Sequence, residues 1–258
     1  LYLYNNKGEL LKQLSSGTWM VTDLIGVDPK ENFVYFKANK ENGIRQNIYQ
    51  LNLKNSAIQL ISSSTGQHFV SFNQNFDLFI DNWSDLENPR IIEIRDVKGK
   101  QIKQLLKAKN PLDGFDLPQV SVFTIKSEDQ KTDLYCRQIL PPNFDKTKKH
   151  PVLVYLYGGP HLQLIQDRFM GGADYWLIYM AQQGYVVFSL DNRGSANRNF
   201  EFESVIHRQL GNAEMNDQLK GVEYLKSQTF VDSTRIGVYG WSFGGFLITT
   251  LMTRALGA

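Results

Sequence analysis

A Gly-x-Ser-x-Gly motif at residues 240–244 joins a strand pattern to a helix pattern. Residues 235–239, Arg-Ile-Gly-Val-Tyr, are typical of a short β-strand, and the apolar residues 246–252 predict a buried helix. A serine on so sharp a turn takes strained backbone dihedral angles. Glycine fits two positions either side of the serine, because a larger side chain would collide as strand and helix approach each other. The motif therefore predicts a tight strand-turn-helix unit with Ser242 at its tip.

Such a unit is the nucleophile elbow of α/β-hydrolases. The N-terminal amides of the following helix favour negative charge that develops beside the serine. We therefore expect Ser242 to be the nucleophile and the backbone N–H of Phe243 to be one oxyanion donor. No Asp, Glu or His follows Ser242, so we expect the catalytic machinery to be cut off after the elbow. A chance motif in a loop is the alternative interpretation.

Composition and charge indicate neither a nucleic-acid-binding nor a metal-binding protein. The chain has 258 residues and a formal net charge of +2, which suits two domains or one large one and gives no reason to expect nucleic acid or an anionic membrane as a partner. The single cysteine, Cys136, lies in an alternating strand pattern and is predicted to be a packed core thiol. The four histidines are far apart, so we expect neither a metal site nor a cofactor.

The N-terminal part of the chain shows short strand patterns, turns and no helix pattern. The turn at residues 28–32 has a counterpart at 73–77, an offset of about 44 residues. Strand patterns lie at residues 33–36, 47–51 and 57–61, and then at 69–72, 78–80, 91–94 and 102–105. With four strands per unit, this period predicts the last blades of a β-propeller, with the remaining blades before Leu1. A β-sandwich is the competing interpretation.

After a turn-rich linker at residues 110–114, strand and helix patterns alternate. Strands are expected at residues 151–157, 185–190 and 235–239, and helices at 175–183, 216–228 and 246–252, the second with Leu219, Val222 and Leu225 at helical spacing. The alternation predicts a mainly parallel sheet covered on both faces, with the nucleophile at the carboxyl end of a central strand. We predict C-terminal β-propeller blades over residues 1–112, and the N-terminal part of an α/β-hydrolase domain over 113–258, truncated after the elbow.

A second oxyanion donor is expected at the turn Tyr157-Gly158-Gly159-Pro160. The turn leaves an earlier strand at the same end of the predicted sheet, and its two glycines let the backbone approach the site. In this interpretation the phenol of Tyr157 donates the proton. The alternative is an ordinary Gly-Pro turn with Tyr157 in the core.

Three motifs, in this order along the chain, resemble the prolyl oligopeptidase clan and more narrowly its dipeptidyl peptidase IV branch. They are Tyr157-Gly158-Gly159-Pro160, Asp191-Asn192-Arg193-Gly194-Ser195 and Gly240-Trp241-Ser242-Phe243-Gly244-Gly245. Tryptophan before the serine is typical of this branch, and residues 205–215 are similar to its bacterial dipeptidyl and prolyl tripeptidyl members. The resemblance is strong over residues 145–258 and weaker over the predicted blades.

The resemblance implies a propeller joined to an α/β-hydrolase domain, and the release of N-terminal di- or tripeptides after proline. It implies Ser242 as the nucleophile, the Tyr157 phenol as one oxyanion donor and the Phe243 amide as the other. The family usually has Tyr where Phe243 stands, but the donor there is the backbone amide. The resemblance also implies peptide substrates with proline near the N-terminus, a homodimer, and an extracytoplasmic location, periplasmic or secreted.

This chain departs from the family pattern in its catalytic triad. The triad Asp and His follow the serine in this fold, and this chain contains neither after Ser242, so we expect the chain alone to be inactive. His161 and His207 precede the serine and are expected to be structural or at the surface. Asp191 and Arg193 are expected to pair with each other or to brace their loop. The alternative functions are another acyl hydrolase, such as an acylaminoacyl peptidase or an esterase, and a non-catalytic propeller interaction protein.

Overall fold

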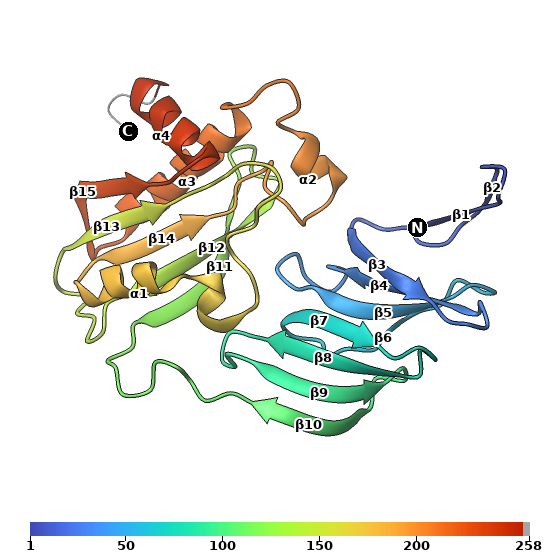
Figure 1. The fold of residues 1–258 in the computed structure, drawn as a ribbon. Coiled ribbons are helices and arrows are strands. Elements are labelled where there is room, and N and C mark those ends of the chain that lie inside the picture. Colours follow the sequence, from blue (N-terminus) through green and yellow to red (C-terminus); the bar gives the residue numbers. More distant parts are fainter. Residues whose placement is uncertain (255–258) are drawn as a thin grey trace. The chain divides into compact units, whose positions relative to one another are not determined.

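The structure, a computed structural model, describes residues 1–254 and divides the chain into two compact units (Figure 1). Unit 1 is Leu1–Asn110 with the short segment Asp167–Phe169, and unit 2 is Pro111–Gln166 with Met170–Ala258. Asp167 belongs to unit 1 because its carboxylate accepts hydrogen bonds from Arg45 Nε (2.6 Å) and from the amide of Gly66 (3.1 Å). The domain boundary after residue 112 stays a prediction.

Unit 1 contains two propeller blades, each a four-stranded antiparallel sheet. The first blade consists of β3 (Val21–Val27), β4 (Phe33–Ala38), β5 (Asn47–Asn52) and β6 (Ile58–Leu60). The second consists of β7 (Gln67–Phe72), β8 (Leu78–Ser84), β9 (Ile91–Asp96) and β10 (Gln101–Lys107), and a separate hairpin of β1 (Tyr2–Tyr4) and β2 (Leu10–Gln13) precedes both blades. The sequence patterns miss β3, because two irregularities in its pairing with β4 break the alternation of its side chains.

An aromatic core joins the two blades. Tyr35 on β4 and Phe79 on β8 are both buried, and Phe72 lies between them, with ring centroids 4.8 Å from Tyr35 and 4.9 Å from Phe79. The hydroxyl of Tyr35 accepts a hydrogen bond from Gln50 Nε2 at 2.8 Å, so its polar atom is satisfied inside this core. The repeated strand patterns thus become neighbouring blades by burying aromatic rings between two sheets.

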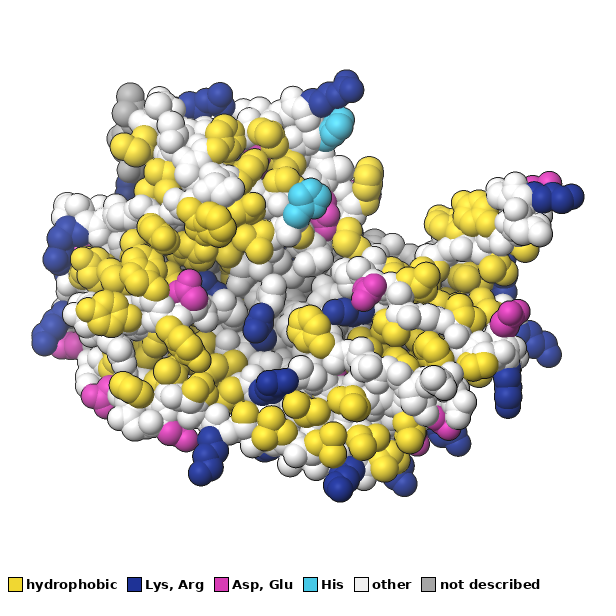
Figure 2. Space-filling view, in the orientation of Figure 1, with side chains coloured by type: hydrophobic (Ala, Val, Ile, Leu, Met, Phe, Trp, Pro, Cys, Tyr) yellow, Lys and Arg dark blue, Asp and Glu magenta, His cyan; other side chains and the backbone are white. Residues whose placement is uncertain are grey.

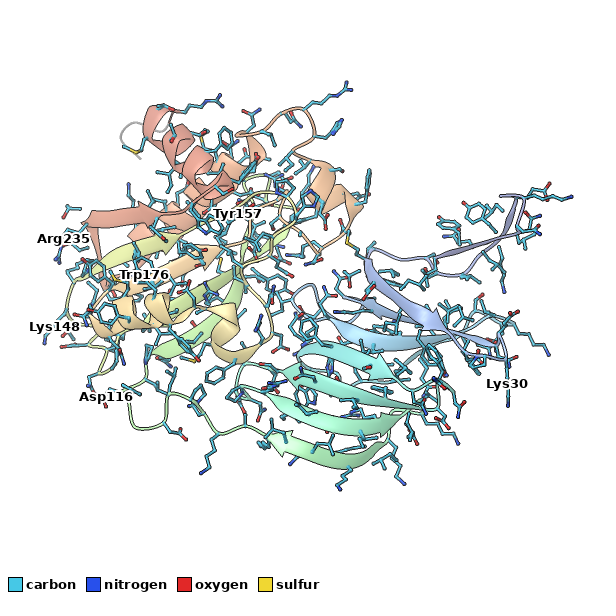
Figure 3. The ribbon with its side chains drawn as sticks, viewed as in Figure 1. Lys30, Asp116, Lys148, Tyr157, Trp176 and Arg235 are labelled. Atoms are coloured by element: carbon cyan, nitrogen blue, oxygen red, sulfur yellow. The ribbon has the colours of Figure 1, made fainter. Side chains whose placement is uncertain are left out.

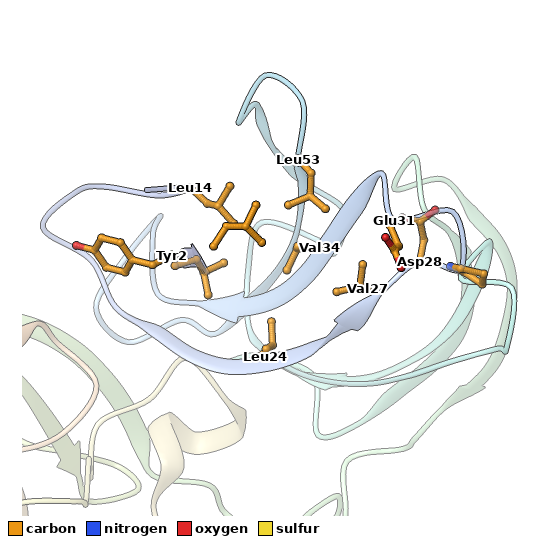
Figure 4. A pocket seen from close by; sticks show the side chains of 11 residues that line it. Tyr2, Leu14, Leu24, Val27, Asp28, Glu31, Val34 and Leu53 are labelled. Atoms are coloured by element: carbon orange, nitrogen blue, oxygen red, sulfur yellow. The ribbon is translucent and has the colours of Figure 1, made fainter. Parts of the chain in front are cut away.

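A second apolar surface of unit 1 lies beside β3 (Figure 4). It is a hollow of about 530 Å³, and aliphatic side chains make up most of its lining: Leu1, Leu3, Leu14, Leu24, Val27, Val34 and Leu53. Asp28 and Glu31 lie together at one end of it. The first blade is therefore apolar on this side as well as toward the second blade.

Unit 2 contains a five-stranded sheet in the order β11-β12-β14-β13-β15. Its strands are β11 (Gln119–Lys126), β12 (Asp133–Leu140), β13 (His150–Tyr155), β14 (Val186–Leu190) and β15 (Val231–Tyr239). The helices are α1 (Tyr175–Gln182), α2 (Phe200–Ser204), α3 (Ala213–Ser227) and α4 (Phe243–Arg254), with a short 3₁₀ segment at Phe169–Gly172. Helix α1 packs on β12 and β14, whereas α3 and α4 pack on β15.

The sheet is mixed, which corrects the expectation of a mainly parallel one. β13 pairs in parallel with both β14 and β15, as the alternation of strands and helices predicts. β11 and β12 instead form an antiparallel hairpin, and β12 pairs antiparallel with β14. A tight turn joins β11 to β12 where a parallel pair would need a crossover connection. Among the strands that the structure describes, β15 lies at the edge of the sheet and not in its centre.

The core of unit 2 confirms one prediction and corrects another. Cys136 on β12 is fully buried, and burial raises the pKa of its thiol, as expected for a packed core cysteine. On α3, Leu225 is buried, but Leu219 and Val222 are only partly so. The other buried residues of this helix are Glu214, Asp217, Gln218 and Gly221. Helix α3 thus turns a polar face inward.

The aromatic core of unit 1 can be tested by truncating one ring. Phe79→Ala is expected to lower the free energy of unfolding by about 3–5 kcal/mol, because it removes a buried ring and leaves a cavity. Phe69→Ala is the matched control: Phe69 is 59% exposed on the adjacent strand β7, and its loss is expected to cost less than about 1 kcal/mol. Urea unfolding of both variants measures the difference, and equal losses would contradict the assignment of this core.

Candidate active site

Ser242 lies on the turn between β15 and α4, with its side chain exposed. Its φ of +55° is in the left-handed region, so the strained turn expected at this serine is present. A Cβ atom on Gly240 would lie 2.5 Å from the carbonyl oxygen of Leu156, and a Cβ atom on Gly244 would lie equally close, at 2.5 Å. The carbonyl of the neighbouring strand therefore occupies the space that side chains at these two positions would need.

The start of helix α4 places backbone donors beside Ser242. The amide of Gly244 donates to the Trp241 carbonyl at 2.9 Å, and the amide of Phe246 donates to the Ser242 carbonyl at 3.2 Å. Within residues 1–254, the amide of Phe243 has no hydrogen-bond acceptor. An unpaired N–H at a helix N-terminus can bind developing negative charge.

Tyr157 follows β13 and lies close to the same turn (Figure 3). The centroid of its ring is 6.2 Å from that of Phe243, the residue after Ser242. A Cβ atom on Gly159 would lie 2.4 Å from Cγ of Phe243, so the glycine lets this turn pack directly on the elbow. The structure therefore brings Tyr157, Ser242 and Phe243 together at one end of the sheet of unit 2.

Asp191 braces the loop that follows the Tyr157 turn. Its carboxylate is buried and accepts hydrogen bonds from the amides of Leu164 (2.9 Å) and Ile165 (2.8 Å). Burial raises the pKa of Asp191 to about 6, although the two amides and the charge of Arg137 act in the opposite direction. Asp191 thus braces the loop that contains Leu164 and Ile165, whereas the expectation was that it braces its own loop.

Arg193 pairs with Asp217 on α3, so the expected pair between Asp191 and Arg193 is wrong. Its backbone N, Nε and Nη2 donate to the two Asp217 oxygens at 2.8–3.0 Å, and Nη1 donates to Asp129 at 2.6 Å. Asp217 is fully buried. No local pattern indicates Asp217 as the partner of Arg193, because Asp217 lies 24 positions further along the chain.

Arg137 is a second buried cation, and its role was not predicted from the sequence. It lies on β12 and donates to the carbonyls of Leu164 (3.2 Å) and Gly171 (3.0 Å) and to Ser189 Oγ (3.1 Å). Its burial lowers the pKa of the guanidinium to about 10. A charged residue inside a buried strand pattern, directly after Cys136, is the signal that could have revealed it.

The histidines occupy structural or surface positions. His161 and His207 are exposed, and the His150 ring lies 3.1 Å from the Asp145 carbonyl oxygen. In unit 1, His68 is buried against Asp81, with Nδ1 2.9 Å from the carboxylate. None of the four is hydrogen-bonded to Ser242 within the described part of the chain.

No group of three or more His, Cys, Asp or Glu within residues 1–254 is placed to hold a metal ion. No helix among these residues is long and apolar enough to cross a membrane.

Family comparisons give two matches, one at each end of the chain. Residues 173–256 match the prolyl oligopeptidase family, and residues 1–90 match the dipeptidyl peptidase IV N-terminal region. Dipeptidyl peptidase 8 of Mus musculus is 31% identical over 259 residues, covering 94% of this chain and 29% of that protein. A probable dipeptidyl-aminopeptidase B of Arthroderma benhamiae is 31% identical over 261 residues, covering 95% of this chain and 28% of that protein. The chain thus spans less than a third of these relatives.

Two solved structures are similar to most of this chain. A putative dipeptidyl aminopeptidase IV from Bacteroides ovatus superposes with a TM-score of 0.90 at 43% identity, covering 95% of this chain and 35% of that one. Porphyromonas gingivalis dipeptidyl peptidase 4 gives a TM-score of 0.91 at 30% identity, covering 99% of this chain and 36% of that one. These matches agree with propeller blades followed by a hydrolase-like sheet.

The packing of the elbow predicts different responses at two adjacent glycines. Gly244→Ala is expected to lower the free energy of unfolding by about 1–3 kcal/mol, because the added methyl meets a backbone oxygen that cannot move aside. Gly245→Ala is the matched control, since nothing lies within 4 Å of its Cβ position and alanine favours the helix. Chemical unfolding of the two variants tests the geometry, which equal stabilities would contradict.

Asp191 predicts a pH-dependent contribution to stability. Its pKa of about 6 in the folded chain lies above the value of about 3.9 for an unfolded aspartate, so the folded state binds more protons between these values. Its contribution is therefore fully present below about pH 4 and is lost as the pH rises through about 6. Unfolding free energies of wild type and Asp191→Asn are compared from about pH 4 to pH 7. The difference, wild type minus variant, is expected to fall by about 2–3 kcal/mol, and a constant difference would refute the shift.

Proposed function

Since this chain belongs to the prolyl oligopeptidase family, in its dipeptidyl peptidase IV branch, we propose that it carries the nucleophile and the oxyanion site of a serine dipeptidyl peptidase. One observation carries the proposal: Ser242 stands at φ +55° on the turn between β15 and α4, with the Leu156 carbonyl packed against Gly240 and Gly244. This geometry exposes the serine hydroxyl beside an unpaired amide, which is the arrangement that acyl transfer requires.

The proposed chemistry is acyl transfer through a covalent intermediate. The Oγ atom of Ser242 attacks the carbonyl carbon of the scissile amide, and its proton passes to the histidine that the family places after the serine. The Phe243 amide and the Tyr157 hydroxyl donate hydrogen bonds to the oxyanion of the tetrahedral intermediate. The histidine gives this proton to the nitrogen of the scissile bond, the C–N bond breaks and the amine leaves. The acyl-enzyme that remains on Ser242 is then hydrolysed by water.

The proposed substrates are peptides with a free N-terminus and proline before the cleaved bond. The relatives are named dipeptidyl peptidases, which supports release of an N-terminal dipeptide. Residues 205–215 also resemble tripeptidyl members of the family, which supports release of a tripeptide as the alternative. An extracytoplasmic location and a homodimer are proposed from the family resemblance alone.

We propose that the 258-residue chain by itself is inactive and poorly soluble. It carries no acid or histidine after Ser242 to act as general base. Large aromatic side chains are also exposed on unit 2, among them Trp176, Tyr239 and Trp241, and Figure 2 shows extensive apolar surface on this unit. Exposed apolar area of this kind favours aggregation.

The nucleophile is tested in the full-length product of the gene with an X-Pro arylamide. Ser242→Ala is expected to leave less than about a thousandth of wild-type kcat/KM, because the covalent step is lost. Ser227→Ala, at an exposed serine at the end of α3, is the control and is expected to retain full activity. Activity of the Ser242→Ala protein above that level would exclude Ser242 as the nucleophile.

Two further measurements separate the alternatives. Hydrolysis of esters or N-acylated amino acids without turnover of X-Pro amides would favour another acyl hydrolase. Turnover of the X-Pro arylamide by the purified 258-residue chain would refute its proposed inactivity.

A further inference from the structure

We propose that Asn192, oriented by Gln218 of helix α3, is a positioning residue that holds the Tyr157 turn in place for oxyanion binding. The inference rests on the proposed function, because it concerns the donor at Tyr157. Its evidence lies in a chain of buried amide hydrogen bonds and in the close packing of Gly158.

The hydrogen bonds connect α3 to the Tyr157 turn through one side chain. Nδ2 of Asn192 donates to the carbonyl of Gly158 at 2.8 Å and to the carbonyl of Arg193 at 2.8 Å. Nε2 of Gln218 donates to Oδ1 of Asn192 at 2.8 Å and to the carbonyl of Leu190 at 3.0 Å. Asn192 is 0% exposed and Gln218 is 2% exposed, so water does not compete for these bonds.

This pattern leaves the Asn192 amide a single orientation. Its oxygen faces a donor on Gln218, and both hydrogens of its nitrogen face carbonyl oxygens. A rotated amide would place its oxygen against two acceptors, which is unfavourable in a buried site. Gln218 therefore fixes which atom of Asn192 meets the Tyr157 turn.

Gly158 is held between Asn192 and the helix that follows the candidate nucleophile. It has a φ of +68°, and a Cβ atom there would lie 2.4 Å from Oδ1 of Asn192 and 2.4 Å from Cδ1 of Leu247 on α4. Asn192 thus supports one side of the turn while α4 supports the other. Tyr157 directly precedes Gly158, so a shift of this turn would also move Tyr157.

The proposal predicts an effect on the rate of the chemical step and not on substrate binding. In the full-length gene product, Asn192→Asp keeps the shape of the side chain but directs a carboxylate oxygen at the Gly158 carbonyl. We expect kcat for an X-Pro arylamide to fall about 10- to 100-fold, as for a small misplacement of a catalytic group. KM is expected to stay within about threefold of the wild-type value.

A second background tests whether Asn192 acts through Tyr157. Tyr157→Phe removes the phenolic donor and is expected to lower kcat about 100- to 1,000-fold. Adding Asn192→Asp to this variant is expected to lower kcat by less than a further factor of about two, because the group that it positions is already gone. A full additional loss in the Tyr157→Phe background would overturn the proposal.

Asn47→Asp is the matched control for the general cost of a buried charge. Asn47 is 0% exposed and donates to the carbonyl of Ser63 at 2.7 Å, but it lies on β5 in unit 1. The Asn47→Asp variant is expected to have a lowered melting temperature, as the Asn192→Asp variant does, but a kcat within about twofold of the wild-type value. A loss of kcat equal to that of Asn192→Asp would show that destabilisation alone explains both variants and would overturn the proposal.

A crystal structure of the Asn192→Asp protein separates this inference from the proposed function. We expect the Tyr157 hydroxyl to move by about 1 Å or more relative to Ser242. If the wild-type protein does not cleave X-Pro amides but the hydroxyl moves, the positioning role stands and the proposed function fails. An unmoved hydroxyl refutes the positioning role whatever the activity. Asn192→Ala, which removes the bond without adding charge, replaces the Asp variant if that variant does not fold.

Discussion

The contact of the Leu156 carbonyl oxygen with the backbone at Gly240 and Gly244 is the constraint on which the candidate site depends. The amide of Leu156 donates to the Tyr239 carbonyl at 3.0 Å, so the pairing of β13 with β15 continues to the elbow. Because the two strands are parallel neighbours, the residues that follow them leave the sheet at the same edge. Tyr157 and Ser242 therefore lie at the same edge of the sheet.

A buried polar layer supports this edge of the sheet from the side of α3. The helix contributes Asp217 to Arg193 and Gln218 to Asn192, both in the loop after β14. Removing one member of a buried ion pair leaves an uncompensated charge, which costs several kcal/mol, so these contacts tolerate few alternative arrangements. Buried hydrogen bonds and ion pairs define the position of a loop more closely than apolar packing does, because each has a fixed direction and a fixed partner.

Much of the architecture could be predicted from local patterns. The elbow, the strands β13, β14 and β15 and seven of the eight strands of the two blades, all but β3, follow from periodicity, turn residues and glycine spacing. The hairpin of β11 and β12 was missed although its strands are adjacent in the sequence. The antiparallel pairing of β12 with β14 could not be predicted locally, because it joins segments far apart in the sequence. The inward face of α3 was misjudged for a related reason, since a polar residue is buried wherever another segment supplies its partner.

The sequence by itself determined that Ser242 stands on a tight turn and that glycines flank it, because steric limits on a strand-to-helix turn act within a few residues. It also determined the blade repeat, because alternation and turns are local properties. Only the tertiary structure decided that Arg193 pairs with Asp217 and that Asn192 holds Gly158, 34 positions away. Hydrogen bonds over such separations form only after the strands and helices have packed, so no local pattern records them.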